Sequence, residues 1–212
     1  CSKIQSIIIP FSVKTIGSQA FYLCVSATSL TIGQGVTTIG QQAFRQCSAI
    51  QSIIIPDSVK TIDSYAFNLC VSATSLTIGQ SVTAIGQQAF RECSKIPSIS
   101  IPDSVKTIDS YAFYLCVSAT SLTIGQSVTT IDTTAFMQCS KIQSITIPNS
   151  VKSISTQAFQ LNVSATSLTI GQGVTSIGNN AFSQCFAIQS IIIPNSVITI
   201  GSNAFLQNVS AT

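Results

Sequence analysis

The apolar residues of the chain recur with a period of 23 positions from one end to the other. When each repeat is counted from its cysteine, position seven is Ile or Leu, position nine is Ile, position thirteen is Val and position sixteen is Ile. Positions twenty and twenty-one are Ala-Phe in every repeat, from Ala20-Phe21 to Ala204-Phe205. Residues 1–212 therefore form one predicted domain, with nine full repeats and the first five residues of a tenth.

Positions seven to nine of each repeat predict a short β-strand, because they are rich in Ile and Thr and end at a Pro or Gly. A single strand cannot bury its own apolar face, whereas stacked repeats bury it against the next turn. We therefore expect a repeat solenoid, a right-handed coil with one parallel β-sheet face. The rest of each repeat is expected to return along the other side as an extended segment or short helical turns. At about 4.8 Å per strand, nine turns give a stack roughly 43 Å long.

A second period of 46 residues is superimposed on the first. The first four odd repeats carry Ser and Ile at positions two and four, as in Ser2 and Ile4, whereas even repeats carry Val and Ala, as in Val25 and Ala27. The larger residue at one position accompanies the smaller residue at the other, which favours interdigitation of core side chains. Position ten alternates between Pro and Gly. The true repeating unit is therefore a pair of turns.

The composition narrows the functional classes. Only 7% of the residues are charged and 45% are hydrophobic, with a mean hydropathy of +0.50, so the chain can build a large core and is not disordered. Its aliphatic runs are too short for a membrane-spanning helix. The net charge of +3 forms no basic cluster for a nucleic acid, and the chain has no His for zinc or general-base chemistry. We predict no enzyme activity, no cofactor and no metal.

The unit Ile-x-x-Ile-x-Ile-Pro-x-x-Val-x-x-Ile-x-x-x-Ala-Phe-x-x-Cys runs from Ile4 to Cys24 and again from Ile50 to Cys70. It resembles the leucine-rich repeats of the BspA type over essentially all 212 residues. The resemblance implies a leucine-rich-repeat solenoid in a surface-exposed protein of bacteria or protists, several of which act in attachment to host matrix or to other cells. Position twelve is Ser or Gly, where better-known leucine-rich repeats have an inward Asn, so we expect no Asn ladder there.

Eight cysteines form one column, spaced 23 residues apart except between Cys139 and Cys185, where Asn162 stands in the missing place. Adjacent turns place these residues about 5 Å apart, but in a parallel stack their side chains point the same way. We favour buried free thiols that act as small apolar core groups. Pairwise disulfides and metal binding are the alternatives, and no close Cys-x-x-Cys spacing supports a metal.

Two N-glycosylation sequons, at Asn162 and Asn208, fall where the column has lost its Cys. A glycosylated Asn cannot point into a core, so a glycan would contradict an inward-facing column at these turns. The alternative is an Asn without a glycan that replaces Cys in a partly exposed corner.

The outward face of the predicted sheet is a ribbon of small hydroxyls almost without charge, because position six is always Ser and position eight is Ser or Thr in six of nine repeats. We interpret this ribbon as the candidate partner-binding face. Its residues are Ser29, Thr31, Ser52, Ser75, Thr77, Ser98, Ser121, Thr123, Ser144 and Thr146. Small residues that simply tolerate a flat sheet are the plainer interpretation. A lattice for ice or a crystalline polymer is a third, and Ile8, Ile54 and Ile192 break the regularity it needs.

Charged and aromatic side chains lie elsewhere in the repeat. Lys60 and Lys106 each precede an Asp by three residues, at Asp63 and Asp109, and we expect weak exposed ion pairs there. The tyrosines lie at positions nineteen and twenty-two of their repeats: Tyr22, Tyr65, Tyr111 and Tyr114. We expect them to cover the edge of the core or to form small contact patches on the return side.

These observations predict a non-enzymatic adhesion or interaction module, extracellular or on a cell surface, that binds a protein or glycan partner. No residue specifies that partner. The chain opens at Cys1 with core residues and stops five residues into a repeat, which we interpret as an uncapped fragment of a longer protein. The alternative function is structural, with molecules stacked end to end into an extracellular filament.

Overall fold

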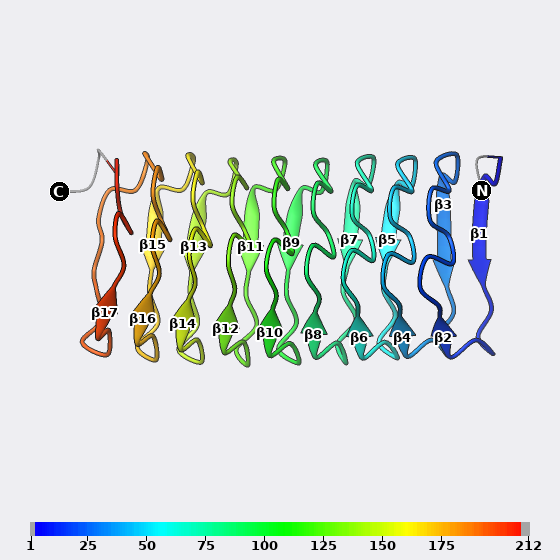
Figure 1. The fold of residues 1–212 in the computed structure, drawn as a ribbon, viewed down its shortest axis with the longest axis horizontal. Coiled ribbons are helices and arrows are strands. Elements are labelled where there is room, and N and C mark those ends of the chain that lie inside the picture. The colour runs from blue at the N-terminus through cyan, green and yellow to red at the C-terminus, as the bar shows by residue number, and fades with distance from the viewer. Residues whose placement is uncertain (1–2, 209–212) are drawn as a thin grey trace.

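The computed structural model describes residues 3–208, which wind into an elongated solenoid of stacked turns (Figure 1). Successive turns lie side by side along the long axis, and the two ends of the chain lie at opposite ends of the stack. Every turn repeats the same path after 23 residues, as the register between neighbouring strands shows. The predicted repeat solenoid is confirmed.

In the first column, every strand begins at the Ser of position six, next to the segment where the sequence predicts a strand. Its members are β1 (Ser6–Ile9), β3 (Ser29–Ile32), β5 (Ser52–Ile54), β7 (Ser75–Thr77), β9 (Ser98–Ser100), β11 (Ser121–Thr123), β13 (Ser144–Thr146) and β15 (Ser167–Thr169). They form four two-stranded parallel sheets, β1–β3, β5–β7, β9–β11 and β13–β15. Each break falls between an even turn and the odd turn that follows it, so the 46-residue period is visible in the backbone.

A second column of strands forms the longest continuous sheet, with nine parallel strands. Its members are β2 (Thr15–Ile16), β4 (Thr38–Ile39), β6 (Thr61–Ile62), β8 (Ala84–Ile85), β10 (Thr107–Ile108), β12 (Thr130–Ile131), β14 (Ser153–Ile154), β16 (Ser176–Ile177) and β17 (Thr199–Ile200). The expectation of a single sheet face is corrected here, because each of the first eight turns contributes a strand to both columns and the ninth contributes one to the second column. Two-residue strands are too short for the alternation of polar and apolar positions to reveal them.

The hydrophobic core lies between these columns and is built from the Ile, Val, Ala and Phe positions that recur every 23 residues. The rings of the Phe column stack turn upon turn, with centroids 5.1–5.5 Å apart and planes within 12° of parallel. The rings from Phe44 to Phe182 are fully buried, as are Val36 and Ile39. Each turn therefore buries its apolar side chains against the equivalent residues of its neighbours.

The return segment contains no helix within residues 3–208 and instead uses left-handed residues that are not glycine. Positions nineteen and twenty-three have φ between 54° and 64° in every turn. In the first turn, the backbone N–H of Gln19 donates to Gln41 O at 2.9 Å and that of Leu23 to Arg45 O at 3.0 Å. The N–H of Ala20 instead donates within its own turn, to Gly17 O. Alternate amides thus bind the next turn, which offsets the strain of the left-handed backbone.

Candidate interaction surface

The candidate Ser/Thr face lies on the outward side of the first strand column, as the sequence predicts. Its ten residues fall in six successive strands, from β3 to β13, and all are exposed except Ser52, which is half-buried. Within a strand pair the hydroxyls interact directly: Ser29 Oγ donates to Ser6 Oγ at 2.9 Å, and Ser75 Oγ donates to Ser52 Oγ at 2.7 Å. Ile54 stands exposed among them, with 57% of its surface accessible. The structure therefore brings these ten residues together into one uncharged row.

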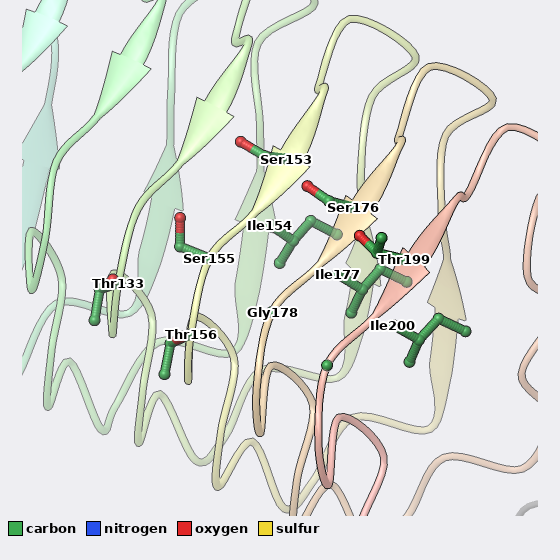
Figure 2. Close-up of a pocket in the computed structure, with 11 residues that line it drawn as sticks. Thr133, Ser153, Ile154, Ser155, Thr156, Ser176, Ile177, Gly178, Thr199 and Ile200 are labelled. Carbon is green, nitrogen blue, oxygen red and sulfur yellow. The ribbon is translucent and has the colours of Figure 1, made fainter.

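The nine-stranded sheet carries a second outward row of hydroxyls at position fifteen, which the sequence analysis missed. In Figure 2, Ser153, Ser176 and Thr199 follow one another across β14, β16 and β17, next to a shallow hollow of about 400 Å³. A similar hollow of about 420 Å³ farther along the sheet contains Asp63 and Asp109. Position fifteen did not stand out in the sequence, because it belongs to no alternating run and is Ala84 in the fourth repeat.

The acidic residues of this second face do not pair with lysine as expected. Within residues 3–208 the single ion pair is Arg91 with Glu92, at 3.0 Å. Lys60 precedes β6 and Asp63 follows it, so extended backbone separates their Cα atoms by about 10 Å. Burial raises the pKa of the Asp109 carboxyl, and the neighbouring carboxylate of Asp132 adds to this effect.

The cysteine column consists of buried free thiols over the described residues, from Cys24 to Cys185, as predicted. Each described thiol from Cys47 onward donates to the carbonyl oxygen of the Phe one turn back, for example Cys47 Sγ to Phe21 O at 3.1 Å. Burial raises the pKa of Cys47 to about 11 and that of Cys93 to about 12. The thiols are therefore protonated hydrogen-bond donors at neutral pH rather than nucleophiles. Cys1 lies outside the described residues.

Asn162 explains why Asn can replace Cys in this column. It is completely buried, and its Nδ2 donates to Phe136 O at 2.9 Å and to Phe159 O at 2.7 Å. The first of these bonds is the one that a thiol makes in the other turns. The expectation that Asn162 lies in a partly exposed corner is wrong, because its side chain is buried. A glycan on Nδ2 is incompatible with this position in the folded protein. The chain therefore has a hydrogen-bonding ladder of Cys and Asn at position one. Position twelve, where better-known leucine-rich repeats have an inward Asn, is Ser or Gly.

Asn208 is the last described residue, and its Oδ1 accepts a hydrogen bond from the backbone N–H of Cys185 at 3.0 Å. The rest of its sequon lies outside the described residues, so glycosylation there stays a prediction. Within residues 3–208 no three His, Cys, Asp or Glu side chains are grouped to hold a metal ion. No helix among the described residues is long and apolar enough to cross a membrane.

Stacked 23-residue turns, parallel strand columns and an inward Cys/Asn ladder define a leucine-rich-repeat solenoid. Comparison with protein families agrees: residues 1–118 and 84–212 match the family described as BspA type leucine-rich repeat region. The chain belongs to this leucine-rich repeat family, and membership implies a protein-interaction module. A search of curated proteins finds no match.

Several solved structures share the fold. A leucine-rich repeat protein from Bacteroides ovatus is 29% identical with a TM-score of 0.85, and the comparison covers 94% of this chain but 54% of that protein. The chain thus spans about half the length of that relative. A leucine-rich cell surface protein from Faecalibacterium prausnitzii is 26% identical, with a TM-score of 0.50 and coverage of 98% and 72%. A leucine-rich repeat protein from T. pallidum is 25% identical, with a TM-score of 0.61 and coverage of 87% and 79%.

Proposed function

We propose that this chain is an extracellular or cell-surface adhesion module that binds a protein partner through the Ser/Thr face of its first strand column. One observation carries the proposal: ten residues from six successive strands form an uncharged row that faces solvent. An uncharged row needs no strong desolvation of ions when a partner covers it. Membership of the BspA-type leucine-rich repeat family supports the location, and the Faecalibacterium neighbour is described as a cell surface protein.

The test introduces bulky charge into this row and measures binding to immobilised matrix and serum proteins. The variant combines Thr31→Arg, Thr77→Arg and Thr123→Arg, all of which replace exposed side chains on the strand surface. We expect a loss of at least about tenfold in affinity, because desolvating an unpaired charge opposes contact. A variant that binds every partner as well as the parent protein would refute the assignment of this face.

The matched control places the same three arginines on the nine-stranded sheet, at Thr38, Thr61 and Thr130. These residues are half-buried at the outward position of short strands, so the control reports the effect of added charge on another face. Both variants should keep the parent's far-ultraviolet circular dichroism and melting temperature within a few degrees. A glycan array run with the same proteins distinguishes a glycan partner from a protein partner.

End-to-end assembly into a filament is the alternative function. It predicts particles that lengthen with protein concentration in light scattering and electron microscopy. Single rods at all concentrations would favour the adhesion module, and long fibres would favour the structural function.

A further inference from the structure

Both arginines and all four tyrosines of the chain lie on a face that the proposed function does not use. They stand at positions nineteen and twenty-two of the left-handed return segment in the first five turns, and all six are half-buried. The guanidinium carbon of Arg45 lies 5.9 Å from the ring centroid of Tyr22 and 5.4 Å from that of Tyr65. Arg91 lies 5.3 Å from the ring of Tyr114 in the same way.

Arg45 is held in place without being neutralised. Its Nε donates to Asn68 Oδ1 at 3.1 Å, and Asn68 is itself buried. Within residues 3–208 no carboxylate lies within ion-pair distance of Arg45. Its two terminal nitrogens therefore keep the planar fork that suits a carboxylate, on a side chain already ordered by Asn68 and two tyrosine rings.

The equivalent arginine of the next pair of turns, Arg91, shows that a carboxylate fits the terminal nitrogens of this side chain. Arg91 occupies the position of Arg45 exactly 46 residues later, and the residue after it is Glu92, where the earlier turn has Gln46. Glu92 Oε1 accepts from Arg91 Nε at 3.1 Å and lies 3.0 Å from Nη2. The chain thus supplies a carboxylate to Arg91 and leaves a neutral amide at the equivalent place beside Arg45.

An apolar hollow of about 210 Å³ lies beside Gln46, the residue that follows Arg45 in the chain. Gln46 lines the hollow together with aliphatic side chains from the turns before and after it. Those side chains are Leu23, Val25, Leu69 and Val71, with Ser48 completing the wall. Leu23 is 42% exposed and Val25 39% exposed, so the hollow presents apolar surface to solvent.

We propose that Arg45 and this hollow form a second binding site, which takes a short acidic segment of a partner protein. A Glu or Asp carboxylate of the partner binds the terminal nitrogens of Arg45, and a neighbouring aliphatic side chain fills the Leu23/Val25/Leu69/Val71 hollow. The four aliphatic walls favour a peptide over an acidic sugar, because a sugar offers no aliphatic side chain to bury. Tyr and Arg are also among the residues enriched at the energetic centres of protein interfaces.

The test is a nuclear magnetic resonance titration of the ¹⁵N-labelled protein with a synthetic peptide. The peptide is acetylated and amidated and carries one Glu followed two residues later by Leu in a Gly/Ser background. We expect shifts at the Arg45 Nε–Hε group and at the Gln46 and Leu69 amides. Peptides with Glu→Gln or Leu→Ser should bind about tenfold more weakly or not at all, since a charge-assisted bond and apolar burial are each lost.

Two protein variants use the natural contrast between the turn pairs. Gln46→Glu should supply an internal carboxylate to Arg45, as Glu92 does for Arg91, and weaken peptide binding at least about tenfold. Glu92→Gln should remove the carboxylate from Arg91 Nε and Nη2, while Nη1 keeps its bond to Gln88 Oε1 at 3.1 Å. It should also add a second set of shifts around Arg91, Leu115 and Val117. Arg45→Gln should abolish the first set, with Lys152→Gln on another face as the control for lost charge.

Three outcomes would overturn the proposal: equal binding of the Glu and Gln peptides, unchanged binding by both Gln46→Glu and Arg45→Gln, or binding of glucuronic acid in place of the peptide. The site is independent of the Ser/Thr face. The triple Arg variant of that face should therefore bind the peptide like the parent, which separates failure of this site from failure of the proposed function.

Discussion

Replacing Phe113 by Ala tests how much the ring stack contributes to stability. Phe113 is fully buried, and its ring lies 5.2 Å from Phe90 and 5.3 Å from Phe136, with interplanar angles of 12° and 2°. A buried Phe→Ala change costs about 3–5 kcal/mol, and each lost aromatic pair accounts for about 0.5–1.5 kcal/mol of that. We therefore expect the upper half of the range, about 4–5 kcal/mol, from guanidinium unfolding followed by circular dichroism.

A double-mutant cycle isolates the stacking from the cavity. Phe113→Ala combined with Phe136→Ala should show a coupling of about 0.5–1.5 kcal/mol, because the two rings are in contact. Combined with Phe182→Ala, three turns away, the effects should add within about 0.5 kcal/mol. Equal coupling in the two cycles would refute the claim that neighbouring rings stabilise each other.

Hydrogen exchange of the single variant reports how far the damage extends. Each turn contacts its neighbours alone, so amides between about residues 90 and 136 should exchange faster while those of β2 and β16 keep their protection. Uniform loss of protection along the chain would contradict nearest-neighbour stacking.

Three further predictions concern the buried thiols, two glycines and Asn162. Folding raises the pKa of Cys93 and of Cys139 to about 12 from an ordinary value of 9.0. Their contribution to the free energy of unfolding is therefore fully present below pH 9 and should fall as pH rises from 9 towards 12. Replacing both residues by Ala should flatten this fall in the guanidinium unfolding midpoint. Gly79→Ala should destabilise the protein by about 2 kcal/mol or more, since its Cβ would meet backbone of the preceding turn, whereas Gly17→Ala, which meets nothing, should change the melting temperature little. Protein secreted from a eukaryotic host should carry no glycan on the peptide containing Asn162, and mass spectrometry that finds one there would contradict its buried position.

Strong periodicity explains why most of the fold could be predicted. Invariant apolar positions identified the core, and the Ile-rich segment with its Pro or Gly stop located the first strand column. The second column was missed because Thr15–Ile16 and its equivalents offer two residues, too few to show a period of two. The left-handed return segment was missed because Gln19, Leu23 and Tyr65 are not residues that signal positive φ.

The candidate surfaces were predictable to a smaller extent. The Ser/Thr face followed directly from strand alternation, since residues two apart share a face. Contact between Arg45 and Tyr65 could not follow in the same way, because it depends on the path of the left-handed turns and joins residues of neighbouring repeats. Once that path is known, the exchange of Gln46 for Glu92 in the next pair becomes the informative difference between otherwise similar turns.

The turn-by-turn hydrogen bonding also has a mechanical consequence. Backbone bonds such as Gln19 N–H to Gln41 O join each turn to the next, and in the described part of the chain no such bond spans several turns. A pulling force applied to the two ends would therefore break the hydrogen bonds between one pair of neighbouring turns at a time. Each released turn of 23 residues would extend to roughly 80 Å, against about 5 Å in the stack. A protein built in this way can lengthen under tension by releasing one turn after another while its remaining turns stay folded.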